Sequence, residues 1–185
     1  SRLAEGKSYD DVPNLWIKKD GGKVIENPLT MVDMDDNPLI DVSIFEEARY
    51  YRPMAGKVYK MFPVEIFRGC PYTCRYCNSP WQAALYKKEA NTKFLRRKSF
   101  EKIEEELYFY KDEMKAEYLY FWSDTFFSWN RDDFYKFCDI YEGIKLPFWI
   151  QTRPETVKYD LFKKLKEIGC HRISFGVEHG NYEFR

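Results

Sequence analysis

The sequence predicts an α/β fold, a partial (β/α) barrel of about four strand–helix units preceded by a β-hairpin and an irregular linker. From residue 62 onward, short apolar segments alternate with segments whose apolar residues recur at helical spacing. The last two units repeat at roughly 25–30 residues, the usual size of one unit. A closed barrel of eight units needs about 250 residues, whereas this chain has 185. We therefore expect a partial barrel or an open sheet with an unpaired last strand, truncated on its C-terminal side.

The first third of the chain differs in composition from the rest. Two short apolar runs flank an Asp-Gly-Gly turn, and this pattern predicts a β-hairpin over residues 14–25. Residues 27–52 are rich in Pro, Asp and Asn and predict an irregular connector. We expect residues 1–60 to be a linker that follows a missing N-terminal domain, and residues 61–185 to be the N-terminal part of the core domain.

The barrel part is expected to contain four strands, each a short apolar run bounded by polar or chain-breaking residues. The first strand is expected to end at Gly69 and Pro71, because these residue types interrupt a β-ladder. The expected strands span residues 62–69, 117–122, 147–151 and 172–177.

Three amphipathic helices are expected between these strands. Ser99 is a suitable N-cap for the first, the second begins near Asn130, and the third ends at Gly169. Their expected apolar faces are formed by Ile103, Leu107, Tyr110 and Met114, by Phe134, Phe137, Cys138 and Tyr141, and by Leu161, Phe162, Leu165 and Ile168.

Composition excludes several classes of protein. Lys and Arg together number 30 and balance 30 Asp and Glu, so no basic excess indicates a nucleic-acid partner. The chain has no run of 18 apolar residues and no signal peptide, so neither a membrane nor a secreted location is indicated. Five cysteines, an odd number with three of them clustered, argue against a disulfide scaffold and favour the cytoplasm.

Two charged clusters are interpreted as solvent-exposed segments that bind no ligand. Asp33, Asp35 and Asp36 are interpreted as a solvated loop, with a cation site as the alternative. The basic run Arg96-Arg97-Lys98 is interpreted as solvated, with a phosphate site as the alternative.

Three cysteines lie within eight residues, as Cys70-x-x-x-Cys74-x-x-Cys77. Three converging thiolates in such a chain indicate a metal or an iron–sulfur cluster. Zinc would make this loop a metal-stapled binding module, with a fourth ligand from elsewhere. A closed cluster with a fourth cysteine would make an electron-transfer protein, but Cys170 is expected at the opposite end of its strand. Cys138, Cys170 and His171 are interpreted as structural.

This spacing, with the aromatic Tyr76 just before the third cysteine, resembles the hallmark of the radical S-adenosylmethionine (radical SAM) superfamily. The resemblance implies a TIM-like (β/α)6 partial barrel, of which this chain would supply the first four units. It also implies that Cys70, Cys74 and Cys77 hold three irons of a [4Fe–4S] cluster. The fourth iron then binds the amino and carboxylate groups of SAM, and Tyr76 contacts SAM.

Polar residues follow each expected strand, where chemistry collects in α/β barrels. By resemblance, the segment after the second strand holds the methionine amino group of SAM, although the usual Gly-Gly-Glu is absent here. Polar side chains at the third and fourth strands then meet the SAM ribose and carboxylate, and Gly176 lets a cofactor approach the backbone. The candidate SAM-binding residues are Ser123, Asp124, Gln151, Arg153, Ser174 and Glu178.

The resemblance implies reductive cleavage of SAM to a 5′-deoxyadenosyl radical, which abstracts hydrogen from a small-molecule substrate. Cofactors perform this chemistry, so we assign no catalytic side chain. An electron donor such as flavodoxin or ferredoxin is expected, and the fragment alone is expected to be inactive.

Residues 172–181 and the hairpin linker resemble the cobalamin-binding branch of the superfamily. The chain lacks the Asp-x-His-x-x-Gly cobalamin motif, so cobalamin would be bound by a domain outside this chain. The branch implies methyl transfer, or a radical rearrangement or cyclisation.

Overall fold

The computed structural model describes residues 2–181 and residue 183. The chain divides into two compact units, of which the first comprises Ser1–Asp33 and Tyr72–Phe94. The second comprises Met34–Pro71 and Leu95–Arg185. The role of residues 1–60 as a linker after another domain stays a prediction.

The first unit contains the predicted hairpin. Strand β1 (Trp16–Lys18) pairs antiparallel with β2 (Val24–Glu26), with the short helix η1 (Asp20–Gly22) between them. Gly21 and Gly22 have φ angles of +79° and +84°, a backbone region that glycine enters without a Cβ penalty. The hairpin prediction is confirmed.

The first unit also contains helix α1 (Ser79–Ala90), which the sequence analysis did not predict. Pro80 lies in its first turn, where a missing N–H costs nothing. The helix ends at Asn91, which adopts the left-handed conformation with a φ of +49°.

The second unit is built on a five-stranded sheet in the order β3-β4-β7-β8-β9. The pairs β4–β7, β7–β8 and β8–β9 are parallel, so the prediction of a parallel α/β sheet that forms part of a barrel is confirmed. Strand β9 lies at one edge of the sheet. The strands are β3 (Tyr51–Met54), β4 (Lys57–Val64), β7 (Tyr118–Phe121), β8 (Phe148–Thr152) and β9 (Cys170–Phe175).

Strand β3 begins inside the segment that we predicted to be irregular, because its first two residues are Tyr51 and Arg52. It pairs antiparallel with β4 through a two-residue turn, Ala55-Gly56, whose φ angles are +53° and +80°. Two positive φ angles match the twist of a tight hairpin, but this turn usually carries Asn-Gly. With Ala55 in the first position the turn has no sequence signature, and the prediction of an irregular connector is wrong for Tyr51 and Arg52.

The predicted first strand, residues 62–69, is two strands in the structure. Strand β4 ends at Val64, and the short β5 (Phe67–Arg68) leaves the main sheet to pair antiparallel with β6 (Arg96–Arg97). Glu65 marks the break, and its carboxylate accepts hydrogen bonds from Arg68 at 2.9 and 2.6 Å. The segment that carries Cys70, Cys74 and Cys77, here called the cysteine loop, therefore follows β5 and not a strand of the main sheet.

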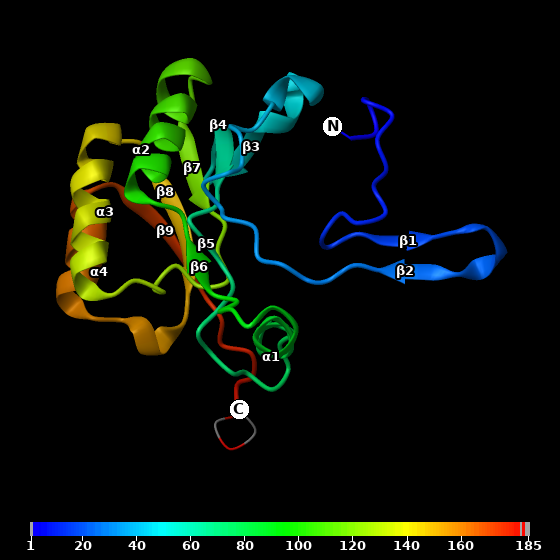
Figure 1. Ribbon diagram of the computed structural model, residues 1–185. Helices are drawn as coiled ribbons and strands as arrows, with labels where there is room; N and C mark the ends of the chain where they lie inside the picture. Colours follow the sequence, from blue (N-terminus) through cyan, green and yellow to red (C-terminus); the bar gives the residue numbers. More distant parts are fainter. Residues whose placement is uncertain (1, 182, 184–185) are drawn as a thin grey trace. The chain divides into compact units, whose positions relative to one another are not determined.

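Helices α2 (Phe100–Tyr108), α3 (Arg131–Ile144) and α4 (Tyr159–Glu167) cover one face of the sheet (Figure 1). The π-helical turn η4 (Phe109–Glu113) extends α2. The predicted caps are present: Ser99 Oγ accepts from Lys102 N, and Asn130 Oδ1 accepts from Asp133 N. Three short 3-10 turns complete the unit, η2 (Val42–Ile44), η3 (Glu47–Tyr50) and η5 (Pro154–Thr156).

The main hydrophobic core lies between these helices and the sheet. Leu119, Phe121 and Phe148 from the strands are at most 3% exposed, and Phe137 from α3 is fully buried among them. The other face of the sheet carries a smaller cluster of Met61, Tyr118 and Tyr120, and it is the face that turns toward the inside of a barrel. Within the described residues, every helix is too short or too polar to span a bilayer.

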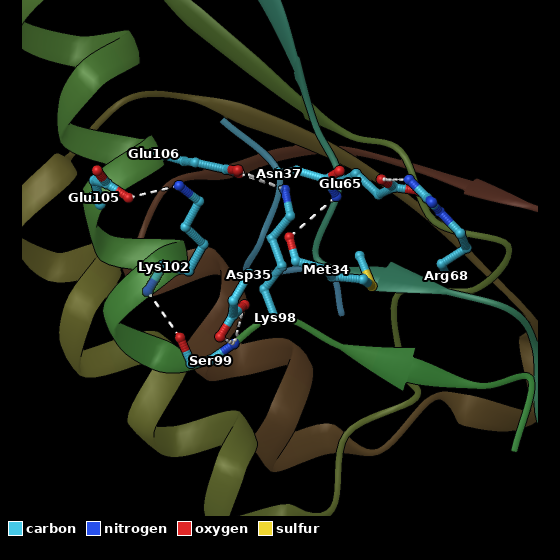
Figure 2. A network of polar contacts seen from close by, with 10 residues as sticks. All are labelled: Met34, Asp35, Asn37, Glu65, Arg68, Lys98, Ser99, Lys102, Glu105 and Glu106. Atoms are coloured by element: carbon cyan, nitrogen blue, oxygen red, sulfur yellow. Dashed lines mark hydrogen bonds and ion pairs between the residues drawn. The ribbon is translucent and has the colours of Figure 1, made fainter. Parts of the chain in front are cut away.

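In the two charged clusters, Asp33 and Asp36 are exposed, whereas Asp35 and the basic run are partly or fully buried. Asp35 accepts two hydrogen bonds from the backbone N–H of Ser99, at 2.9 and 3.2 Å, and so supports the start of α2 (Figure 2). Lys98 is only 6% exposed, and its ammonium donates to both carboxylate oxygens of Glu106. Arg96 and Arg97 form strand β6, and both are half-buried. The solvated interpretations of Asp35 and of the basic run are therefore wrong.

Gly169→Ala is expected to lower the free energy of unfolding by more than about 1 kcal/mol. Gly169 follows α4 with a φ of +108°, and an added Cβ would lie 3.1 Å from the carbonyl oxygen of Leu146. Urea unfolding at pH 7 measures the effect. Gly180→Ala is the matched control, because no heavy atom of the described residues lies within 4 Å of a Cβ added at Gly180. Equal unfolding midpoints for the two variants would contradict the expectation.

Candidate functional site

The cysteine loop follows β5 and crosses from one unit to the other after Pro71. Cys70 belongs to the second unit, and Cys74 and Cys77 belong to the first. Cys70 and Cys74 are half-buried, whereas Cys77 is exposed. Among the described residues, none of these thiols forms a disulfide. Metal binding requires such unpaired cysteines, which bind a metal as thiolates.

Cys77 lies just before helix α1. The backbone N–H of Ser79 donates to Cys77 Sγ at 3.4 Å, and the N–H of Cys77 donates to the Cys74 carbonyl at 3.1 Å. An N–H donor at the N-terminus of a helix favours a sulfur atom that carries negative charge. This position suits a thiolate ligand of a metal or a cluster.

The convergence of the three thiols stays a prediction. Among the described residues, no three or more Cys, His, Asp and Glu side chains are gathered as a ligand group. Tyr76 is on the same loop and is 66% exposed. Its contact with SAM is likewise a prediction.

The end of β7 carries a buried polar atom without a partner. Ser123 is 3% exposed, and its Oγ accepts or donates no hydrogen bond among the described residues. Gln151 Nε2 donates to the Ser123 carbonyl at 2.7 Å, which joins the ends of β7 and β8. Asp124 follows with its side chain exposed. An unpaired buried hydroxyl is costly, so Ser123 is suited to meet a polar ligand group.

The ends of β8 and β9 carry the other candidates. Arg153 lies 3.4 Å from the Glu155 carboxylate. Ser174 stands opposite Gln151 in the β8–β9 register, and its Oγ accepts from Trp149 Nε1 at 2.9 Å. Because β7, β8 and β9 are parallel, all these residues lie near the carboxyl ends of the strands, on the same side of the sheet.

Glu178 is exposed beyond β9 with a φ of +65°. An added Cβ at Gly176 would lie only 2.7 Å from Glu178 Oε1. A side chain at Gly176 would therefore compete with this carboxylate for the same space.

These residues fit a ligand that carries an ammonium, a carboxylate and hydroxyl groups. Asp124 and Glu178 supply negative charge, and Arg153 supplies positive charge. Ser123 supplies a hydroxyl that is unpaired among the described residues. The three thiols of the cysteine loop are the ligand type that iron–sulfur clusters require.

The other cysteines are unsuited to be ligands. Burial raises the pKa of Cys138 to about 12, and Cys138 is fully buried in the core as predicted. Burial also raises the pKa of Cys170 to about 12, and Cys170 opens β9 at the end away from the candidate site. His171 Nδ1 lies 3.2 Å from Tyr118 Oη, which agrees with a structural role.

The sequence analysis assigned no role to three threonines at these strand ends, Thr125, Thr152 and Thr156, whose hydroxyls form a hydrogen-bonded chain. It also missed Trp149, the donor to Ser174. The only available signal was the presence of hydroxyl residues directly after two apolar strands.

Comparison with known proteins gives the family. Residues 64–185 match the radical SAM superfamily. The chain is also 26% identical over 182 residues to an uncharacterized methyltransferase, PH0819, of Pyrococcus horikoshii. That alignment covers 95% of this chain and 36% of the relative, so the chain spans about a third of the relative's length.

Two solved structures are similar in fold, and both are of the radical SAM methyltransferase TsrM from Kitasatospora setae. One contains cobalamin and a [4Fe–4S] cluster, and the other contains tryptophan substrate and the SAM analogue aza-SAM. Their TM-scores are 0.60 and 0.61 at 15% sequence identity. Each alignment covers 98% of this chain, and 36% and 35% of the respective TsrM chains.

The family match extends over about two thirds of the chain and includes the cysteine loop, β7, β8 and β9. The similar structures agree with the predicted partial barrel. The chain therefore belongs to the radical SAM superfamily.

Proposed function

We propose that this chain forms the N-terminal part of the core of a radical SAM enzyme. Cys70, Cys74 and Cys77 hold a [4Fe–4S] cluster, and SAM binds at the carboxyl edge of β7, β8 and β9. The observation that carries the proposal is the superfamily match over residues 64–185, which contains all three cysteines in their characteristic spacing.

The chain's own residues bind and orient the cofactors. Three thiolates leave one iron without a protein ligand. Ser123 and Asp124 receive the amino group of SAM, and Arg153 pairs with its carboxylate. Gln151, Ser174 and Glu178 meet the ribose, while Tyr76 lies against SAM. When bound, the cluster and SAM supply one-electron cleavage of SAM and hydrogen abstraction from the substrate.

Burial at this edge supports the assignment. Ser123 Oγ is buried and has no hydrogen-bond partner in the described part of the chain, so a hydrogen bond to SAM would satisfy it. The Ser123 carbonyl is already fixed by Gln151. This hydrogen bond from the Gln151 side chain fixes the backbone at Ser123 before the ligand arrives.

For the whole protein we propose a cobalamin-dependent methyltransferase of the cytoplasm. The methyltransferase names of the similar proteins and the cobalamin bound by TsrM support this. Cobalamin would be held by a domain outside this chain, and the substrate is a small molecule. An external electron donor such as flavodoxin or ferredoxin reduces the cluster.

Low-temperature EPR of the anaerobically reconstituted, dithionite-reduced protein tests the proposal. We expect a [4Fe–4S]⁺ signal whose g values shift when SAM is added, because SAM binds the open iron. A cluster signal that ignores SAM would indicate a closed cluster and an electron-transfer protein. Stoichiometric zinc without iron would indicate a metal-stapled binding module. Either result would contradict the proposal.

A further inference from the structure

Three threonine hydroxyls form a hydrogen-bonded chain at the carboxyl ends of β7 and β8. Thr125 Oγ1 lies 3.2 Å from Thr152 Oγ1, and Thr152 Oγ1 lies 2.9 Å from Thr156 Oγ1. Thr156 Oγ1 donates to the Arg153 carbonyl at 2.6 Å. Thr125 is 1% exposed and Thr152 is 4% exposed, so water does not compete for the bond between them.

The chemistry of the last acceptor fixes the direction of the whole chain. A carbonyl oxygen can only accept, so the single hydroxyl proton of Thr156 is committed to Arg153. Thr152 must then donate to Thr156, and Thr125 must donate to Thr152. Of the three threonines, Thr152 is the one whose hydroxyl is bonded to both of the others, so removal of this hydroxyl breaks two hydrogen bonds.

The backbone of the same strand end joins further loops. The Thr152 carbonyl accepts from the N–H of Gly176 at 3.3 Å, just after β9. The Gln151 carbonyl accepts from the N–H of Phe126 at 2.9 Å, beyond β7. Thr152 therefore lies where the loops after β7, β8 and β9 are tied together.

These three loops carry the proposed SAM contacts. Ser123 and Asp124 lie two residues and one residue before Thr125, and Arg153 directly follows Thr152. Glu178 lies two residues after Gly176. A shift of one loop against another would change the spacing between the groups that receive the two charged ends of SAM.

We infer that Thr152 is a positioning residue, whose hydroxyl couples the loops after β7 and β8 so that Ser123, Asp124 and Arg153 are held at the spacing SAM requires. This inference rests on the proposed function. Thr152 itself does not touch SAM. Its effect on binding passes through Thr125 on one side and through the Arg153 carbonyl on the other.

The variant Thr152→Val tests the inference, because valine keeps the shape of threonine and removes only the hydroxyl. The Kd of SAM is measured on the reconstituted holoenzyme before reduction, so that SAM is not cleaved. We expect a rise in Kd of about five- to tenfold, the effect of one or two lost hydrogen bonds. Thr152→Ser, which keeps the hydroxyl, is expected to bind nearly as the wild type does.

A double variant separates positioning from stability. Thr152→Val leaves the buried Thr125 hydroxyl without its acceptor, which destabilises the fold. Thr125→Val combined with Thr152→Val removes this orphan, so the thermal midpoint should recover while the Kd stays raised. If SAM affinity recovers together with the midpoint, the role is structural only and the inference is overturned.

Failure of the inference is distinguishable from failure of the proposed function. If the wild type binds SAM and Thr152→Val binds it equally well, the inference alone is overturned. Wild type that carries a cluster and does not bind SAM would overturn the proposed function and this inference with it. The g-value shift on SAM addition gives a second readout, and it should require higher SAM concentrations in Thr152→Val.

Discussion

Cys74→Ala is expected to reduce bound iron from about four atoms per chain to below about one. The three cysteines are the proposed ligands of a single cluster, and alanine cannot replace a thiolate. In the full-length protein, SAM cleavage should fall below detection, because the site for the open iron is lost. Iron and acid-labile sulfide analysis after anaerobic reconstitution measures the first effect, and release of methionine from SAM measures the second.

Cys170→Ala is the matched control for this variant. It removes one half-buried thiol, as Cys74→Ala does, but from the end of β9 away from the candidate site. Iron content and SAM cleavage should stay at the wild-type level. Loss of iron in Cys170→Ala would mean that this cysteine closes the cluster, which would favour an electron-transfer protein instead.

The parallel part of the fold could be predicted because its signals are local. Strand β8 and helix α3 have clear periodicity, and α3 begins at an Asn130 cap that the sequence shows directly. The cysteine spacing is equally local, and it was sufficient to suggest the superfamily that residues 64–185 match. Patterns contained within one turn or one strand can therefore be recognised from the sequence alone.

The missed elements depend on contacts between distant segments. Strand β3 contains Pro53 and is mostly exposed, so it shows no alternation of apolar and polar residues. Strand β6 has only two residues and exists because β5 pairs with it. Neither strand has a pattern of its own, and each is stabilised by its partner.

The candidate site was predictable in its residue types and not in its connections. Ser123 and Arg153 were expected at strand ends, where the structure has them. The hydroxyl chain joins Thr125 to Thr152, which are 27 residues apart in sequence. No periodicity encodes such a contact, because it depends on the register of β7 against β8.

Glu106→Leu is expected to lower the free energy of unfolding by about 3–5 kcal/mol. Lys98 Nζ donates to both Glu106 oxygens at 2.7 Å, and the side chains are 7% and 10% exposed (Figure 2). Leucine removes the carboxylate and leaves the Lys98 ammonium buried without its counter-charge. Urea unfolding at pH 7 measures the loss. Glu105→Gln on the same helix is the control. The Glu105 side chain is 54% exposed, so its pair with Lys102 should contribute less than about 1 kcal/mol.

The double variant Lys98→Met with Glu106→Leu shows whether the cost comes from the unpaired charge. Two apolar side chains of similar volume need no partner, so we expect stability within about 1 kcal/mol of wild type, or above it. A double variant as unstable as Glu106→Leu would mean that the pair holds the local structure by its specific geometry.

The ion pair lies close in sequence to the cysteine loop. Lys98 directly follows β6, and β6 pairs with β5, which ends two residues before Cys70. The N–H of Lys98 also donates to the Ile66 carbonyl at 3.1 Å, so the ion pair fastens the base of the cysteine loop to α2. Glu106→Leu should therefore lose iron at a lower temperature than the double variant does.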